Sequence, residues 1–176
     1  MKKIVFLRHA KTKMNEQGLF CGVIDTDITE DGRKEAEKMR ENFKTFHFDA
    51  IYCSPLKRTK QTLEIIFPNK KFIEDKGFTE ISLGDWEGLK KESINQSLRE
   101  DFQKGKYTPP HAEKNELVEA RVKEAIERIF ETYPDNFVIL VCTSNGIMRT
   151  IKRIYNIKDE KRMYSNLEYI VLNREA

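Results

Sequence analysis

Short runs of apolar residues alternate along the chain with longer stretches in which apolar positions recur every three or four residues. The short runs, which predict strands, lie at residues 4–7, 49–53, 71–74, 137–142 and 169–172. The periodic stretches, which predict helices, lie at residues 29–46, 54–67, 90–104, 113–133 and 147–155. Strands that alternate with helices predict an α/β fold, a three-layer α/β/α domain with a mostly parallel sheet.

Two of the expected helices have recognisable starts. Thr29 is a suitable N-cap for the first, because its hydroxyl can accept a hydrogen bond from a backbone N–H of the first turn. Ser54 and Pro55 favour the start of the second, with serine as the N-cap and proline at the first helical position. In the first helix the periodicity predicts a buried face of Gly32, Ala36, Met39, Phe43 and Phe46.

Two segments lack a long regular pattern. Residues 9–28 are polar and contain glycines, and a connection of this length in a compact domain usually has a function. Residues 78–112 contain a turn-rich loop, a short charged helical stretch and a break at two consecutive prolines. We expect a single domain over residues 1–176. Within it, residues 78–112 are expected to form a small cap-like insertion that lies over the functional site.

The bulk composition narrows the classes of protein. The 176 residues are 39% hydrophobic and 35% charged, with a net charge of only +3 and with both signs interleaved. This pattern argues against a dedicated nucleic-acid binder, which usually carries a stripe of unopposed positive charge. No apolar run approaches a membrane span. The three cysteines, Cys21, Cys53 and Cys142, are odd in number and lack CxxC spacing, so we expect a reduced, cytoplasmic setting.

The first strand ends in an unusual pair of side chains. The run Ile-Val-Phe-Leu stops at Arg8 and His9, which places a cation and an imidazole at the carboxyl end of a buried strand, where ligands bind in open α/β sheets. The guanidinium can fork onto phosphate oxygens, and a neutral imidazole can attack phosphorus. Arg58 lies in the first turn of the helix expected after the second strand, close to the end of that strand, so we expect it at the same edge of the sheet if the two strands are parallel neighbours. The pattern favours phosphoryl chemistry.

A set of motifs in a fixed order resembles the histidine phosphatase superfamily, the phosphoglycerate mutase-like group. The matching positions include Leu-Arg-His-Ala-Lys-Thr at residues 7–12, Cys-Ser-Pro-Leu-Lys-Arg at 53–58, Thr-Glu at 79–80 and Gly-Asp-Trp-Glu-Gly at 84–88, together with Asn15, residues 20–22, Thr29, Gly32, Ala36, residues 109–110, Glu113, residues 121–122, Gly146 and Arg149. No single piece is decisive, but the ordered set is specific and spans nearly the whole chain.

The resemblance implies a role for each matching position. His9 would be the nucleophile that forms a phosphohistidine, and Arg8 and Arg58 would hold the phosphoryl oxygens, with Asn15 beside them. Glu80 would be the general acid for the leaving oxygen and then the base that activates water. Because arginines supply the positive charge, the scheme needs no metal and no cofactor. We also expect Cys21, Gly22 and Asn145 at the rim of the site.

One position departs from the family. Its second histidine, which follows the fourth strand, is replaced here by Ser144 in Thr-Ser-Asn-Gly. Loss of one preorganised hydrogen-bond donor to the phosphoryl group costs about 2.7–4 kcal/mol, or roughly 10²–10³ in rate. A serine hydroxyl can still donate, so we expect Ser144 among the phosphate-binding residues. His111, in the cap-like segment, is more readily explained as an exposed loop histidine.

Several alternatives remain to be weighed. A cysteine-dependent phosphatase needs five residues between its cysteine and arginine, whereas four separate Cys53 from Arg58 and six separate Cys142 from Arg149, so we reject it. Metalloenzyme spacings are absent from the sequence. A degenerate phospho-ligand binding protein and a phosphoglycerate mutase-type phosphotransferase stay open. We favour a phosphomonoester hydrolase, with a small phosphorylated substrate that the sequence does not identify and an oligomeric state that it does not predict.

Overall fold

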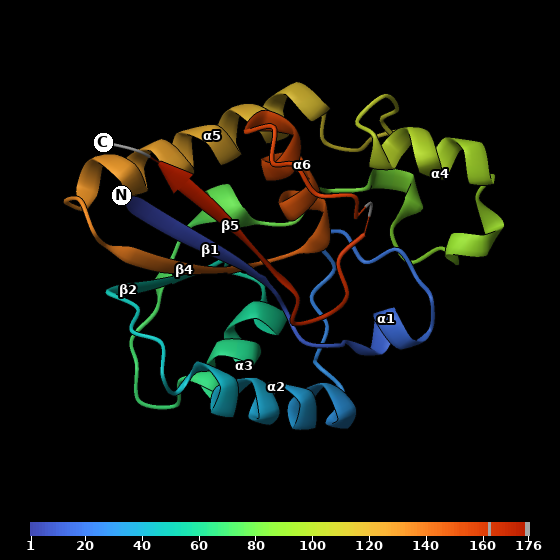
Figure 1. Cartoon of the computed structure of the whole chain (residues 1–176). Coiled ribbons are helices and arrows are strands. Elements are labelled where there is room, and N and C mark those ends of the chain that lie inside the picture. The colour runs from blue at the N-terminus through green and yellow to red at the C-terminus, as the bar shows by residue number, and fades with distance from the viewer. Residues whose placement is uncertain (162, 175–176) are drawn as a thin grey trace.

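The computed structural model describes residues 1–161 and 163–174, and this part of the chain contains a five-stranded sheet of order β3-β2-β4-β1-β5 (Figure 1). The strands are β1 (Lys2–Arg8), β2 (Ala50–Cys53), β3 (Ile73–Glu74), β4 (Val138–Thr143) and β5 (Tyr169–Arg174). β1 to β4 run parallel, and β5 pairs with β1 in the antiparallel direction. The α/β fold with a mostly parallel sheet is therefore confirmed.

The helices cover both faces of the sheet (Figure 1). They are α1 (Lys13–Glu16), α2 (Glu30–Phe43), α3 (Lys57–Ile66), α4 (Gln96–Gln103), α5 (Asn115–Thr132) and α6 (Asn145–Ile154), with 3₁₀ turns η1 (Lys76–Phe78), η2 (Gly84–Trp86) and η3 (Lys91–Ser93). Alternate side chains of β1 enter different cores: Phe6 packs with α5 and α6, and Leu7 packs with α2 and α3. The apolar run of β1 is thus explained by burial on both faces.

Helix α2 begins as expected and ends earlier. The Thr29 hydroxyl caps it by accepting a hydrogen bond from the Gly32 N–H at 3.0 Å. The helix stops at Phe43, so the prediction that it runs to residue 46 and buries Phe46 is wrong. Phe46 is 56% exposed and packs edge-on against Phe43 beyond the helix end.

The predicted start of α3 at Ser54 and Pro55 is also wrong. The Ser54 N–H donates to the Cys142 carbonyl at 3.2 Å, so this residue still belongs to the pairing of β2 with β4. Its hydroxyl lies 3.0 Å from the Thr59 hydroxyl. Leu56 is the N-cap instead, without a side-chain hydrogen bond. The helix begins two residues later than predicted, and Arg58 is still in its first turn.

The segment between η1 and α5 contains less helix than its sequence predicts. The expected helix over residues 90–104 is interrupted, because the Asn95 side chain accepts a hydrogen bond from the Ser97 N–H at 2.8 Å and so starts α4 as a new helix. Trp86 anchors the segment through ring contacts with Phe20, Phe102 and Tyr107. The predicted bounds of this cap-like segment, residues 78 and 112, stay a prediction.

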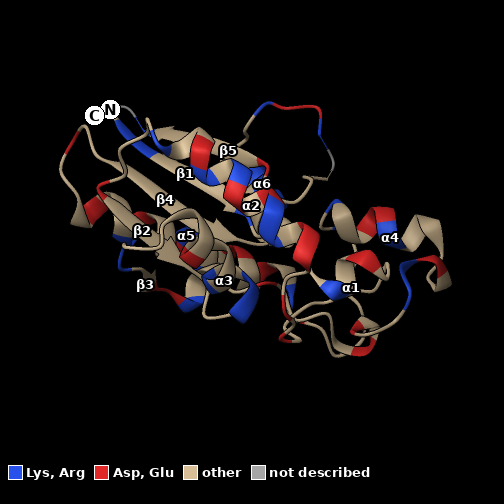
Figure 2. Ribbon diagram, turned by 90° about the horizontal axis from the view of Figure 1, so that it is seen from below, with Lys and Arg blue, Asp and Glu red and all other residues tan. Residues whose placement is uncertain are grey.

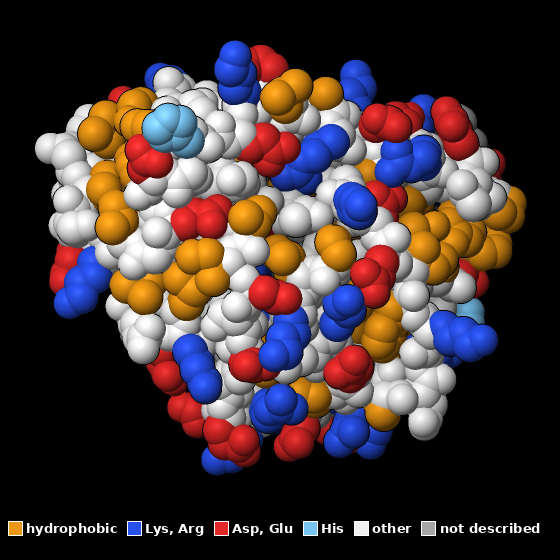
Figure 3. Space-filling view, turned by 180° about the vertical axis from the view of Figure 1, so that it is seen from behind, with side chains coloured by type: hydrophobic (Ala, Val, Ile, Leu, Met, Phe, Trp, Pro, Cys, Tyr) orange, Lys and Arg blue, Asp and Glu red, His pale blue; other side chains and the backbone are white. Residues whose placement is uncertain are grey.

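Charge is spread over the surface. Figure 2 shows lysine, arginine and acidic residues mixed along most helices, and on the face in Figure 3 positive and negative side chains alternate rather than gather by sign. Within the described residues, no helix combines the length and the apolar character that crossing a membrane requires.

Candidate active site

The carboxyl ends of three neighbouring parallel strands meet at one edge of the sheet. The register pairs Arg8 of β1 with Thr143 of β4, and Cys142 of β4 with Cys53 of β2. The His9 N–H continues this pairing by donating to the Thr143 carbonyl at 3.0 Å. The segments that follow β1, β2 and β4 are therefore brought together, as the sequence predicts for this edge.

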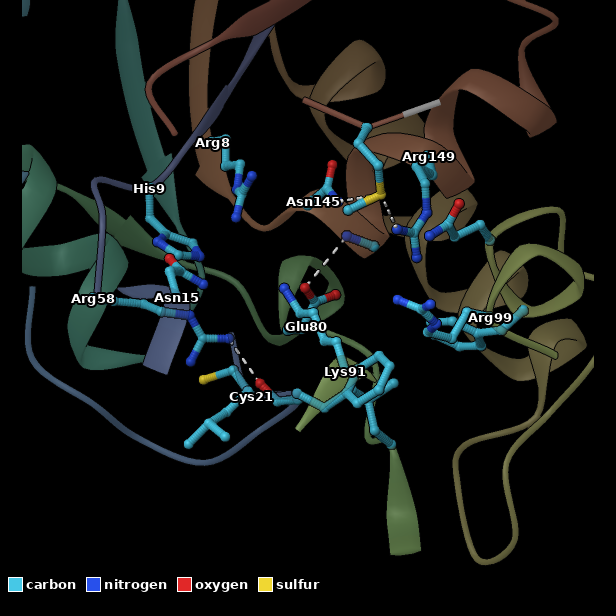
Figure 4. A pocket seen from close by; sticks show the side chains of 18 residues that line it. Arg8, His9, Asn15, Cys21, Arg58, Glu80, Lys91, Arg99, Asn145 and Arg149 are labelled. Carbon is cyan, nitrogen blue, oxygen red and sulfur yellow. Dashed lines mark hydrogen bonds between the residues drawn. The ribbon is translucent and has the colours of Figure 1, made fainter. Parts of the chain in front are cut away.

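A cavity lies at this edge and is drawn in Figure 4. It encloses about 110 Å³, less than the roughly 300–1,000 Å³ of pockets for drug-sized ligands. Eight of the nine residues predicted for the site line it, namely Arg8, His9, Asn15, Cys21, Gly22, Arg58, Glu80 and Asn145. Ser144 is the exception.

His9 is held as a neutral imidazole. Its side chain is buried, and Nδ1 lies 2.7 Å from the Ala10 carbonyl oxygen. Because a carbonyl only accepts, Nδ1 carries the proton and Nε2 keeps its lone pair. Burial, followed by the charges of Arg58 and Arg8, lowers the pKa of His9 well below its ordinary value of 6.5.

The two arginines are held in place by backbone carbonyls. Arg58 is 1% exposed, and its terminal nitrogens donate to the carbonyls of Ile24 at 3.0 Å and Gly22 at 2.7 Å. Arg8 donates to the Tyr164 carbonyl, and burial lowers its pKa. In both side chains the buried Nε has no hydrogen-bond partner among the described residues. Each arginine therefore retains a donor.

Glu80 meets the start of α6. One carboxyl oxygen accepts a hydrogen bond from the backbone N–H of the next residue, Ile81, at 2.9 Å. The other accepts a hydrogen bond from the Gly146 N–H at 3.3 Å. A Cβ added at Gly146 would lie 2.3 Å from Glu80 Oε1, so only glycine allows this approach. The two hydrogen bonds hold the carboxyl group in the cavity wall, which Figure 4 shows between the His9 side and the Arg149 side.

Asn15 is oriented by the short helix that it helps to start. Its Oδ1 accepts from the Thr12 N–H and from the Asn166 amide, both at 3.2 Å, which leaves Nδ2 as its available donor. Helix α1 was not predicted from the sequence, although the Thr12 and Asn15 side chains form a capping box there. This box places Asn15 in the cavity wall.

The three rim residues serve different purposes. The Gly22 carbonyl holds Arg58 in place, and the Cys21 thiol donates to the Ile24 carbonyl at 3.4 Å, with its pKa raised by burial. The Asn145 amide accepts from the Tyr164 N–H at 3.0 Å. It therefore ties the segment before β5 to the cavity.

Ser144 is the N-cap residue of α6, but its side chain makes no capping hydrogen bond. The residue is fully buried, and its hydroxyl has no hydrogen-bond partner in the described part of the chain. It does not line the cavity, whereas Asn145 and Gly146 beside it do. The structure thus leaves the expected contact of Ser144 with phosphate as a prediction.

Comparison with known proteins decides the family. The model of the histidine phosphatase superfamily (branch 1) matches residues 4–172. The chain belongs to the histidine phosphatase superfamily. It is 33% identical over 149 residues to phosphoserine phosphatase 1 of Hydrogenobacter thermophilus, which covers 80% of this chain and 70% of the relative. It is 32% identical over 130 residues to a 2,3-bisphosphoglycerate-dependent phosphoglycerate mutase of Thermoplasma acidophilum, covering 72% and 65%.

A solved structure agrees at the level of the fold. The mycobacterial glucosyl-3-phosphoglycerate phosphatase in complex with VO3 superposes with a TM-score of 0.87 and 20% identity, covering 98% of this chain and 93% of that one. The likeness extends over the whole α/β architecture of the superfamily. The match to the family model and the likeness to a relative named as a phosphatase make the chain an enzyme of the histidine phosphatase superfamily.

The cavity of this superfamily member contains cations that sequence reasoning missed. Lys91 of η3, Arg99 of α4 and Arg149 of α6 all line it. Arg149 belongs to the motif set, one helical turn after Gly146, but it was given no role. Lys91 and Arg99 lie in a stretch whose many charges are typical of a solvated surface, so no sequence signal distinguishes them.

Two further features bear on the chemistry. Among residues 1–161 and 163–174, no group of three or more His, Cys, Asp and Glu side chains could hold a metal ion. His111 lies outside the cavity, with its side chain 83% exposed and its Nδ1 2.9 Å from Asp85 Oδ1. Among the described residues, His9 is the histidine that lines the cavity.

Proposed function

We propose that this enzyme is a phosphomonoester hydrolase that works through a phosphohistidine at His9. Its substrate is a small phosphorylated compound, and it acts in the cytoplasm without a metal ion or cofactor. In the first step Nε2 of His9 attacks phosphorus and the bond to the leaving oxygen breaks. Glu80 gives that oxygen a proton. Water then attacks the phosphohistidine and returns a proton to Glu80, which releases phosphate and neutral His9.

The observation that carries the proposal is the pair of Nε–H groups on Arg8 and Arg58, which have no partner in the described part of the chain and lie beside a neutral histidine. A buried N–H without an acceptor costs about 1–3 kcal/mol, more on a charged group. A phosphoryl group supplies acceptor oxygens to both donors at once, because guanidinium groups match its geometry and charge. Asn15 Nδ2 is a further donor on the same wall.

His9 fits the role of nucleophile in its protonation state. The Ala10 carbonyl fixes the tautomer in which Nε2 has a lone pair, and the low pKa keeps this form at neutral pH. An imidazolium could not attack phosphorus. The same arginines that bind the phosphoryl group therefore keep the nucleophile reactive before the substrate arrives.

Ser144 favours a second candidate, a catalytically impaired phospho-ligand binding protein. Its hydroxyl is buried and does not line the cavity. It therefore stabilises the phosphoryl group by hydrogen bonding less than the family's histidine would. We expect a slow hydrolase rather than a pure binder, because His9, Glu80 and both arginines are retained. A phosphoglycerate mutase outcome, for which relatives give precedent, would appear as transfer of phosphate between hydroxyl groups of the substrate instead of its release.

The test is release of phosphate from p-nitrophenyl phosphate in the presence of a chelator. We expect turnover by the wild-type chain, none by His9→Ala, and unchanged turnover by His111→Ala, the matched control in an exposed loop histidine. The phosphoenzyme is also trapped directly and located on His9 by peptide mass, with acid avoided because the P–N bond of a phosphohistidine is hydrolysed at low pH. Equal rates for the wild type and His9→Ala would overturn the mechanism and favour the binding protein.

A further inference from the structure

The two peptide bonds that flank His9 are each held from both sides. In the peptide between Arg8 and His9, the N–H donates to the Thr143 carbonyl at 3.0 Å. The carbonyl of the same peptide accepts from the Leu167 N–H at 3.1 Å. These partners are backbone groups, as is usual where a strand ends inside a sheet. In the next peptide, between His9 and Ala10, both partners are side chains.

Thr62 of α3 and Asn166, in the segment before β5, are those partners. The Thr62 hydroxyl accepts from the Ala10 N–H at 2.9 Å, and Asn166 Nδ2 donates to the His9 carbonyl at 2.9 Å. Because a peptide unit is planar, two hydrogen bonds on its opposite sides fix its orientation. Thr62 and Ala10 are fully buried, so their hydrogen bond is shielded from exchange with water.

Each of the two side chains makes a second hydrogen bond inside the site. The Thr62 hydroxyl donates to the Arg58 carbonyl at 2.7 Å, and Asn166 Nδ2 donates to Asn15 Oδ1 at 3.2 Å. These bonds use the one hydroxyl proton of threonine and both protons of the amide. Figure 4 shows His9, Asn15 and Arg58 on the same side of the cavity. Thr62 and Asn166 therefore tie the proposed nucleophile to two of the groups proposed to hold the phosphoryl oxygens.

The orientation of this peptide bears on the tautomer of His9. The Ala10 carbonyl lies 2.7 Å from Nδ1 of the ring. Between the ring and this carbonyl lie the rotations ψ of His9 and φ of Ala10, which together set how the peptide between the two residues is turned. Holding that peptide therefore holds the carbonyl at Nδ1. The proton stays there, and Nε2 keeps its lone pair.

The backbone beside Asn166 is strained. Leu167 has φ 63°, in the left-handed region that is unfavourable for a residue with a branched side chain. The turn brings the Leu167 N–H to the Arg8 carbonyl and the Asn166 amide to the His9 carbonyl. Backbone strain of this kind persists where surrounding contacts enforce it, and it concentrates at functional sites. The strained turn thus supports a role for Asn166 in the site.

We infer that Thr62 and Asn166 are positioning residues, which hold the peptide between His9 and Ala10 and so fix the tautomer and direction of the nucleophile. Neither side chain lines the cavity, so both act through His9 and not on the substrate. The inference rests on the proposed function for the role of His9 in catalysis. The tautomer itself is measurable without turnover.

The experiment records the ring nitrogens of histidine by ¹⁵N NMR at about pH 8, above the ordinary pKa of the imidazole. The chain has three histidines, and the His9 signals are those that His9→Ala removes. We expect a protonated Nδ1 and an unprotonated Nε2 in the wild type. In Thr62→Val, which replaces the hydroxyl by a methyl group, and in Asn166→Leu, both signals should shift toward those of a tautomer mixture. The reason is that the carbonyl that selects one tautomer is no longer fixed.

Activity provides the second readout. We expect kcat/KM for p-nitrophenyl phosphate to fall about tenfold or more in each variant, since a misplacement of about 1 Å costs roughly 10²-fold in rate. Thr62→Ser keeps the hydroxyl and should restore the wild-type ring signals and most of the rate. Thr59→Val is the matched control. It removes another fully buried hydroxyl of α3, which donates to the carbonyls of Ser54 and Leu56 at 2.8 Å, and it should leave the His9 signals unchanged.

Three results overturn the inference: wild-type ring signals in both Thr62→Val and Asn166→Leu, the same shift in Thr59→Val, or a proton on Nε2 in the wild type. If Thr62→Val does not fold, Asn166→Leu tests the same peptide from a half-buried position in a different segment. A tautomer that depends on these residues, without hydrolysis by the wild type, keeps the positioning role and removes the hydrolase. Hydrolysis that depends on His9, with wild-type signals in both variants, does the reverse.

Discussion

Gly146 offers a test of Glu80 that leaves the carboxyl group itself in place. A Cβ added at Gly146 would lie 2.3 Å from Glu80 Oε1 and 3.0 Å from the Cδ1 atom of Ile81. Comfortable contacts between heavy atoms are about 3.5–4.0 Å. In Gly146→Ala the carboxyl group must therefore move by about 1 Å, away from the N–H of residue 146 that now holds it.

The expected cost falls on activity and not on folding. A misplacement of about 1 Å in a catalytic constellation costs roughly 10²-fold in rate, which is about 2.7 kcal/mol in the activation free energy. Both atoms in the way are ends of flexible side chains, and alanine is favoured over glycine in a helix by about 0.8–1 kcal/mol. We expect the free energy of unfolding of Gly146→Ala to stay within about 1 kcal/mol of the wild-type value.

The assay compares kcat/KM for p-nitrophenyl phosphate and the urea midpoint in a double-mutant cycle. Gly146→Ala is expected to lose about 10²-fold in the wild-type background and almost nothing in the Glu80→Gln background, because its effect acts through that carboxyl group. Full activity of Gly146→Ala, or the same loss in both backgrounds, would refute the reasoning and remove Glu80 from the proposed proton transfers.

Three further predictions concern stability, each measured by urea denaturation. The pKa of His9 lies below 6.5 in the folded chain, so as the pH falls the unfolded chain binds a proton at His9 that the folded chain does not bind. The free energy of unfolding should therefore fall between pH 7.5 and pH 5, and a His9→Ala variant with the same pH slope contradicts this. Trp86→Ala should cost about 3–5 kcal/mol, because the ring is buried in the aromatic cluster under the cap-like segment; a loss below 1 kcal/mol would exclude it as an anchor. Arg121→Met should cost about 1.5–3 kcal/mol, because it breaks two hydrogen bonds to Glu113, whereas the more exposed Arg128→Met should cost under about 1 kcal/mol; equal losses would show that partial burial of the Arg121–Glu113 pair does not strengthen it.

The central sheet was predictable because its strands leave a strong local signal. Residues buried on both faces, as in β1 and β4, are nearly all apolar, and nothing else in a short chain has this pattern. Helix boundaries were less predictable, since they depend on tertiary partners. Serine is favoured at N-caps, but the Ser54 N–H donates to the Cys142 carbonyl across the sheet. The local sequence does not reveal this contact.

Some residues of the candidate site could likewise be predicted from the sequence, and others could not. His9 could be located because it follows β1 directly, and Arg58 because it lies in the first turn of the helix after β2. Parallel strands bring their carboxyl ends together. Arg99 could not, because a cation in a short, highly charged helix has the same local pattern whether it faces solvent or a cavity. Ser144 follows β4 directly, but the direction of its side chain is set by how α6 joins β4, which the sequence does not specify.

The arrangement around His9 links its reactivity to the presence of a phosphoryl group. Arg8 and Arg58 disfavour positive charge on the imidazole, which keeps the nucleophile neutral but also opposes the charge that it acquires on bonding to phosphorus. In the proposed reaction the phosphoryl oxygens lie between the arginines and the ring, so their negative charge offsets this repulsion. The Ala10 carbonyl, 2.7 Å from Nδ1, also stabilises the charged ring, because a hydrogen bond to an acceptor strengthens as the donor becomes cationic. Attack is thus favoured only when a phosphoryl group occupies the arginines, and a ligand that lacks one meets a neutral and weakly basic histidine.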